Sequence, residues 1–125
     1  MNWDKYPNFS EEEFACSETG ECKMSAAFMK KMQELRDVYG NPMTITSGYR
    51  SPKHSIEASK PTGKLSTHAR GCAADIACNG QQAYEIMKLA FQLGFTGIGV
   101  SQKGSARFVH LDTFSGSPRP NIWSY

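Results

Sequence analysis

The sequence predicts one small domain in which helices are combined with a sheet. A chain of 125 residues fits one domain, and a domain of this size buries roughly two thirds of its unfolded surface. Two long segments have apolar residues at helical spacing, and four short segments have the composition and period of strands. The hydrophobic content of 39% and the charged content of 21% are ordinary for a soluble globular protein.

Helix ends are marked by capping residues. Ser10 and Glu13 form a capping box, which predicts a short helix over residues 10–16. Ser25 is placed to cap a longer helix that stops at Gly40. In the second half of the chain, a similar apolar period begins after a capping asparagine and stops before a glycine, at Asn79 and Gly94.

The strands are shorter and carry polar side chains on one face. Strands are expected over residues 43–46, 73–77, 97–101 and 108–113, the last two joined by a turn. Successive side chains of a strand point to opposite faces. His110 and Asp112 therefore share one face of the last strand, and Asp75 lies on the polar face of its own strand.

Two of the three histidines and one of these aspartates fit the needs of a catalytic zinc. Such an ion takes about three protein ligands from His, Asp, Glu or Cys and keeps a further position open for water. His68 lies seven residues before Asp75, and His110 comes from the distant last strand. These three residues are the candidate ligands of one zinc ion. The alternative for each residue alone is an ordinary surface or core side chain.

Five short motifs occur in a fixed order: residues 47–52 (SGYRSP), 66–76 (STHARGCAADI), 97–100 (GIGV), 108–112 (FVHLD) and 119–125 (RPNIWSY). This order resembles the zinc D-Ala-D-Ala carboxypeptidases and peptidoglycan L,D-endopeptidases, a group that includes many phage endolysins. The resemblance extends from about Phe9 to the last residue. It implies a small α+β domain with a central antiparallel sheet, one zinc held by His68, Asp75 and His110, and hydrolysis of a peptide bond in the stem or cross-link of the cell wall.

The resemblance also assigns Arg50 to the substrate. Wall peptides end in carboxylates, and a guanidinium offers a planar pair of donors that matches such a group. The alternative is a structural arginine paired with an acid. Tyr49 and Ser66 are expected to line the same cleft, and Trp123 either lines it or packs in the core.

The segment that leads into His68 is long and polar. Residues 51–67 show no sustained period, and loops of this length are commonly functional or disordered. We interpret it as a wall of the substrate cleft, in which His54 faces solvent.

The position of the general base is a departure from the resemblance. Much of the family has an acid three residues before the last histidine, where this chain has Arg107. Asp112, on the same strand face as His110, is the nearest substitute. It either accepts the proton as catalytic base or only orients His110.

Four cysteines restrict the disulfide possibilities. Cys72 and Cys78 flank a strand and would be about 20 Å apart, too far for a bridge. Cys16 and Cys22 bracket a turn that could close as a bridge, but reduced thiols are expected for a cytoplasmic product. A second zinc site is not favoured because there is no Cys-x-x-Cys pair.

The remaining expectations concern location and partners. The N-terminus lacks a secretory signal and no run of about 18 apolar residues exists, so the product is expected to be soluble, cytoplasmic and monomeric. Reaching the wall would then require a membrane-permeabilising partner or a virus particle, which favours a phage or prophage origin. A net charge of +2 is too weak to indicate nucleic acid.

Two noncatalytic classes stay open beside the peptidase. Hedgehog signalling domains resemble this fold and keep a zinc without established peptidase work, so a zinc-containing wall-binding module is one alternative. A structural part of a virion is the other. Arg107 at the family's acid position keeps both open.

Overall fold

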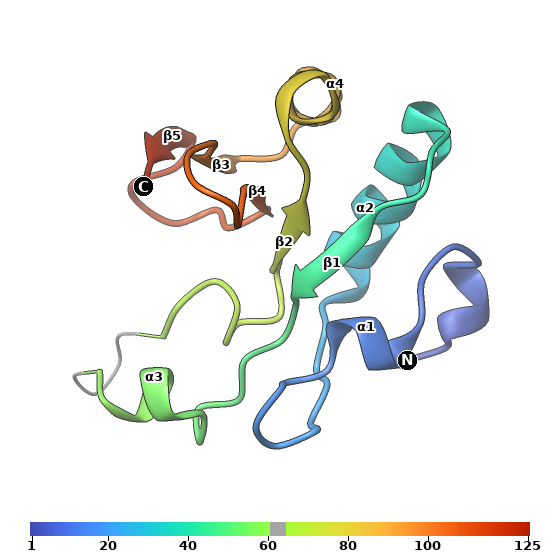
Figure 1. Cartoon of the computed structure of the whole chain (residues 1–125). Coiled ribbons are helices and arrows are strands. Elements are labelled where there is room, and N and C mark those ends of the chain that lie inside the picture. The colour runs from blue at the N-terminus through green and yellow to red at the C-terminus, as the bar shows by residue number, and fades with distance from the viewer. Residues whose placement is uncertain (61–64) are drawn as a thin grey trace.

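The computed structural model describes residues 1–60 and 65–125 and shows one sheet with helices beside it (Figure 1). The helices are η1 (Trp3–Lys5), α1 (Glu11–Phe14), α2 (Ala26–Tyr39), α3 (Ser55–Ala58) and α4 (Gly80–Gln92). The strands are β1 (Thr44–Ser47), β2 (Ala73–Ala77), β3 (Gly97–Ser101), β4 (Phe108–Asp112) and β5 (Asn121–Ser124). Within these two described ranges, no helix has the length and apolar character needed to cross a membrane.

The five strands form a single sheet in the order β1-β2-β4-β3-β5. Neighbouring strands are antiparallel, except that β5 runs parallel to β3. The predicted α+β class is confirmed. The sheet is mixed rather than wholly antiparallel because the chain reverses direction before and after β4, and β5, which the sequence analysis did not include, then lies along the outer edge of β3.

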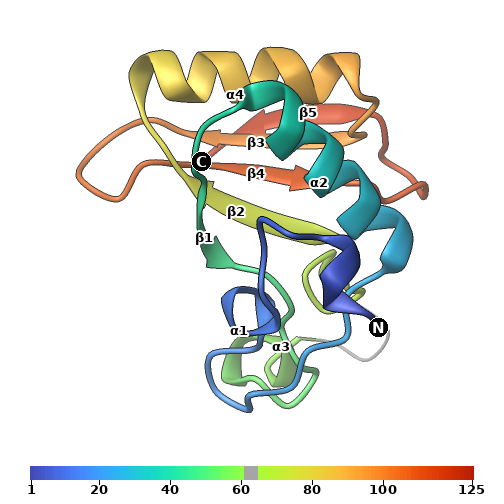
Figure 2. The same cartoon turned by 90° about the vertical axis from the view of Figure 1, so that its right-hand side faces the viewer.

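Helices α2 and α4 cover one face of the sheet (Figure 2). Their apolar side chains join those of the strands in one hydrophobic cluster. Ile76 of β2 and Val109 and Leu111 of β4 are at most 1% exposed, and each such burial stabilises the fold by roughly 1.5–3 kcal/mol. This apolar face confirms the predicted alternation and leaves the other face of β2 and β4 to polar side chains.

The two long helices begin and end close to the predicted residues, but one cap differs. The Ser25 hydroxyl accepts the first-turn amide of α2 at 3.2 Å, and α2 ends at Gly40 in a left-handed conformation with φ of 74°. Asn79 occupies the N-cap of α4 without a side-chain cap bond. Instead, Gln102 accepts the Gly80 amide at 3.1 Å, so the cap comes from the turn between β3 and β4.

The short helix α1 has its predicted capping box but ends early. Ser10 and Glu13 bond reciprocally at the N-terminus. The helix stops at Phe14, two residues before the predicted end, because the Cys16 amide donates to the Glu21 carbonyl at 2.7 Å and so closes a loop in place of another helical turn.

The long polar segment is not wholly irregular. It contains α3, whose first turn is capped by His54: Nδ1 accepts the Ile56 amide at 3.1 Å. The sequence offered no sustained period because a four-residue helix spans only about one turn. Pro61 and Gly63, which contributed to the prediction of a loop, lie outside the described residues.

All four cysteines are free thiols. Cys72 and Cys78 lie just outside the two ends of β2, so the exclusion of a bridge between them is confirmed. Cys16 and Cys22 are not bridged, in agreement with the expected reduced state.

Candidate metal centre

Strand register brings two of the predicted ligands together. Asp75 in the middle of β2 lies directly opposite His110 on β4, and directly opposed residues have their side chains on the same face. His68 comes from the turn over residues 67–71 that leads into β2. The polar face predicted from the period of two therefore carries Asp75 and His110, and the turn brings His68 to Asp75.

The three side chains converge on a single point. One ligand atom from each of His68, Asp75 and His110 can be chosen so that all lie within 4.8 Å of one another. Asp75 Oδ1 is 3.4 Å from His68 Nε2 and 3.0 Å from His110 Nδ1. Ligand atoms around a tetrahedral zinc lie about 3.3 Å apart, so the spacing suits that ion.

The remaining nitrogen of each histidine has its own acceptor. His68 Nδ1 lies 2.8 Å from the Gly48 carbonyl oxygen, which can only accept, so Nδ1 carries a proton and Nε2 is the nitrogen left to face Asp75 and a metal. His110 Nε2 lies 2.7 Å from Asp112 Oδ2, which leaves Nδ1 to face Asp75. Metal-binding histidines are typically oriented in this way by an acceptor behind the ring. The residues therefore fit a metal of the zinc type.

The charges of Asp75 and His110 stabilise each other. Burial opposes ionisation of Asp75, but hydrogen bonds from His110 and His68 outweigh it and hold the pKa at about 2. Burial disfavours the charged form of His110, but the carboxylates of Asp112 and Asp75 outweigh it and raise the pKa.

Asp112 is enclosed and fully paired. Its side chain is 0% exposed, and Arg119 donates to both oxygens, from Nε at 3.0 Å and from Nη2 at 2.8 Å. The Phe114 amide and His110 supply further bonds. Burial opposes ionisation of Asp112, but these partners outweigh it and hold the pKa at about 2.

Two glycines of β3 make room for this arrangement. A Cβ at Gly97 would overlap the Asp112 carboxylate, and a Cβ at Gly99 would overlap the Trp123 indole. The Trp123 ring in turn lies 5.2 Å from the His110 ring, measured between centroids. The close packing behind His110 therefore explains why β3 reads Gly-Ile-Gly.

Comparison with protein families supplies the decisive observation: the Peptidase M15 family matches residues 7–112. The chain belongs to the Peptidase M15 family. Membership implies a zinc-dependent metallopeptidase. The match ends at Asp112, so Arg119 and Trp123 lie beyond the matched residues. A comparison with curated proteins finds no match.

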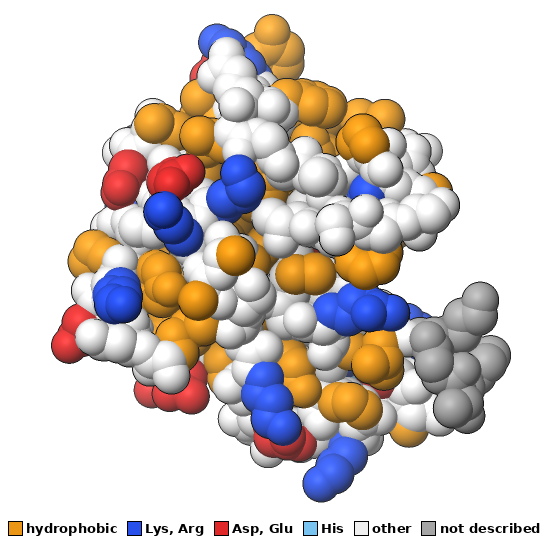
Figure 3. All heavy atoms as spheres, turned by 180° about the vertical axis from the view of Figure 1, so that it is seen from behind, with side chains coloured by type: hydrophobic (Ala, Val, Ile, Leu, Met, Phe, Trp, Pro, Cys, Tyr) orange, Lys and Arg blue, Asp and Glu red, His pale blue; other side chains and the backbone are white. Residues whose placement is uncertain are grey.

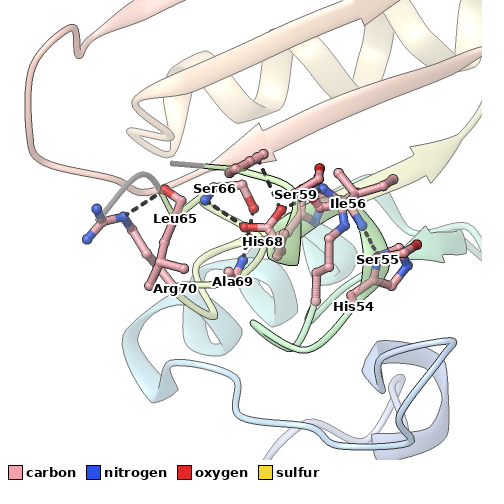
Figure 4. Close-up of polar contacts among 12 residues, drawn as sticks. His54, Ser55, Ile56, Ser59, Leu65, Ser66, His68, Ala69 and Arg70 are labelled. Carbon is pink, nitrogen blue, oxygen red and sulfur yellow. Dashed lines mark hydrogen bonds and ion pairs between the residues drawn. The ribbon is translucent and has the colours of Figure 1, made fainter. Parts of the chain in front are cut away.

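Two of the predicted substrate residues of this M15 family member, Arg50 and Ser66, lie beside His68, each with a structural partner. The Arg50 amide donates to the His68 carbonyl at 3.2 Å, while Nη1 of Arg50 pairs with Glu57 at 3.3 Å. The Ser66 hydroxyl accepts the Ala69 amide and so fixes the turn that holds His68 (Figure 4). Tyr49 is 5% exposed and its ring belongs to the hydrophobic cluster.

Arg107 takes no part in the metal group of this M15 domain. It is exposed, and its Nε donates to the Gly104 carbonyl at 3.1 Å within the turn before β4. Position 107 therefore supplies no carboxylate to the metal group.

His54 does not face solvent as expected. Its side chain is 12% exposed, and Nε2 pairs with Glu18 at 3.1 Å. The cap that it provides for α3, on the opposite ring nitrogen, explains its partial burial. It stays outside the metal group.

Two residues of the site were missed. The sequence analysis included Arg119 only as part of a motif, without a role, and did not include Glu57. The Glu57 carboxylate is wholly buried. An acid in a polar segment gives no sign that it will be buried.

A space-filling view shows the surface hollowed between the part with β3 to β5 and the part with α3, with basic side chains along the hollow (Figure 3).

Glu57 predicts a loss of stability in acid. Burial opposes its ionisation, but the Ser66 amide, Lys60 and Arg50 outweigh it and hold the pKa at about 2. Because the folded pKa lies below the unfolded one, the stabilisation is present above about pH 4.5 and is lost as the pH falls toward 2. Urea unfolding should show that the free energy of unfolding falls less in Glu57→Gln than in the wild type as the pH is lowered from 4.5 toward 2. We expect the two decreases to differ by on the order of 2 kcal/mol. Parallel pH curves for the two proteins would contradict it.

Proposed function

We propose that this M15 family member is a zinc peptidase that hydrolyses peptide bonds in the stem or cross-link of bacterial peptidoglycan, as a carboxypeptidase or an endopeptidase. The observation that carries the proposal is the convergence of His68 Nε2, Asp75 Oδ1 and His110 Nδ1, with the other nitrogen of each histidine already engaged. These three residues are the proposed ligands of one zinc per chain.

In this proposal the zinc supplies the catalytic chemistry, and residues of the chain bind the substrate and position the ligands. When bound, zinc supplies a Lewis acid that activates water and polarises the scissile carbonyl. Arg50 lies beside His68 and offers its guanidinium to a substrate carboxylate. Ser66 holds the turn that presents His68, and Tyr49 supports the segment from the core side.

Of its two predicted roles, Asp112 is assigned to orienting His110. A general base needs a free lone pair within reach of the proton that it removes. Both oxygens of Asp112 are engaged by Arg119, and the side chain is shielded from solvent. It accepts from the His110 nitrogen that does not face Asp75, which is the position of an orienting partner.

A noncatalytic zinc module remains the second candidate, and Arg107 is the observation that favours it. Among the residues that the structure describes, only Asp75 and Asp112 bring a carboxylate within ion-pair distance of the two site histidines. A wall-binding module or a structural part of a virion would need the zinc and the fold but no proton relay.

The proposed site of action is the bacterial cell wall. Stem peptides are the proposed partners, met by a monomer that a membrane-permeabilising protein or a virus particle brings to the wall. Neither nucleic acid nor membrane insertion enters the proposal.

Digestion of purified peptidoglycan separates these functions. With zinc present, mass analysis should show newly hydrolysed stem or cross-link peptides and intact glycan strands, and a chelator should abolish the release. The position of the new termini distinguishes a carboxypeptidase from an endopeptidase. Cut glycan strands, or an unchanged wall at saturating zinc, would reject the peptidase; binding to the wall without cleavage would support the module.

A further inference from the structure

Glu57 is a buried acid that the metal group does not use. It belongs to α3, in the segment leading into His68, and its side chain is 0% exposed. A buried carboxylate is costly unless it is paired and hydrogen-bonded. Its partners therefore indicate what the burial achieves.

The Glu57 carboxylate joins three segments that are separate in sequence. Oε1 accepts the Ser66 amide at 3.0 Å. Oε2 lies 3.3 Å from Arg50 Nη1 and 3.1 Å from Lys60 Nζ. One side chain thus ties the segment after β1, the end of α3 and the turn before β2 to one another.

Two of these segments are also fastened to His68. The Gly48 carbonyl accepts from His68 Nδ1, and the Arg50 amide donates to the His68 carbonyl. Ser66 lies two residues before His68 and fixes its turn. Arg50 is therefore held at two points relative to the metal group. Its backbone is held by the His68 carbonyl, and its guanidinium is held by Glu57.

Arg50 also borders a small polar cavity next to a proposed ligand. The cavity has a volume of about 120 Å³, and Ser47 and Arg50 contribute to its wall together with one acid, Glu13, on the side of α1. Ser47 is the cross-strand partner of Asp75. Because two cations share one anion in the cluster of Arg50, Glu57 and Lys60, one positive charge is in excess, and a further carboxylate would balance it.

We propose that Glu57 is a positioning residue that holds Arg50, with Lys60, as a subsite for a peptide carboxylate. The inference rests on the proposed function, because the carboxylate is that of a wall peptide. A guanidinium held by a fixed partner loses less freedom when it binds a second carboxylate. Glu57 acts through Arg50 and does not itself touch the substrate.

The sign of one effect distinguishes positioning from simple attraction. Glu57→Gln keeps the shape and an acceptor for Ser66 but removes a negative charge, so the cluster becomes more positive. Attraction alone then predicts tighter binding of a carboxylate. Positioning predicts weaker binding, because Arg50 is no longer held.

The test compares a synthetic stem peptide that ends in D-alanyl-D-alanine with its C-terminal carboxamide. We expect Glu57→Gln to lower the preference for the carboxylate, as the ratio of the two kcat/KM values, about tenfold and mainly through KM. Glu85→Gln, an exposed acid on α4, is the matched control and should keep the preference. In an Arg50→Ala background, Glu57→Gln should change the ratio no further. Zinc content close to one per chain shows that each variant is folded.

Three outcomes decide the inference. An unchanged or increased preference in Glu57→Gln, or an equal loss for both peptides, overturns positioning. If Glu57→Gln does not fold, Glu57→Asp, which keeps the charge but shortens the reach, is used instead and should lower the same ratio. If the wild type cleaves neither these peptides nor purified peptidoglycan, the proposed function fails; if it cleaves only peptidoglycan, the proposed function stands. In both cases the direct binding affinities of the two peptides decide the role of Glu57.

Discussion

Replacing His110 by alanine is expected to remove the bound zinc and to reduce the hydrolysis of wall peptides to background. His110 Nδ1 is one of three converging ligand atoms, so its loss should cost more than the 10- to 100-fold in affinity that changes behind a ligand cost. His68→Ala and Asp75→Ala should behave alike. Stability falls as well, because a ligand at a hundred times its Kd adds about 2.7 kcal/mol to the unfolding free energy.

Elemental analysis of the purified variants checks this prediction. His54→Ala is the matched control, because His54 is the third histidine of the chain and pairs with Glu18 away from the metal group. It should keep close to one zinc per chain. A full complement of zinc in the His110→Ala variant would exclude the proposed ligand set.

Arg119→Ala should destabilise the protein by about 3 kcal/mol, because it leaves the buried carboxylate of Asp112 without its cation. Arg119 donates to both oxygens of Asp112 and lies over the Trp123 ring, with Cζ 4.8 Å from the centroid. With Asp112 less firmly held, His110 loses orientation, and zinc affinity should fall by about 10- to 100-fold. Urea unfolding of the metal-free protein and zinc titration measure the two effects.

Arg107→Ala is the control for the loss of an arginine. Arg107 is exposed, and within the described ranges its side chain bonds only to a turn carbonyl, so the change to alanine should alter stability by no more than about 0.5 kcal/mol. Equal unfolding free energies for Arg119→Ala and the wild type would show that the pair with Asp112 contributes nothing, and the orienting role of Asp112 would lose its support.

The convergence of the site on one face could be predicted because a strand has a side-chain period of two. That period placed Asp75 and His110 on the polar faces of two short strands, and their register then made them direct partners. The acceptors behind the histidines could not be predicted in the same way. The Gly48 carbonyl reaches His68 only because two distant backbone segments pack together.

The missed features share one physical cause, which is contact between segments with no regular period. Glu57 is buried through Arg50, just before the long segment, and Ser66, near its end, and Arg119 reaches Asp112 across the loop after β4. His54 was expected in solvent because its role as the cap of α3 depends on a helix of only four residues. Strand β5 lies parallel to β3, a pairing that a local pattern does not specify.

Zinc titration of the metal-free protein tests the central claim most directly. The chain is stripped with a chelator, zinc is added back in steps, and the release of peptides from purified peptidoglycan is followed together with the bound metal. Activity should rise in proportion to the metal and level off at one zinc per chain, and His110→Ala should show neither. Peptide release that is already complete without metal, or a protein that binds one zinc and releases nothing, would contradict it.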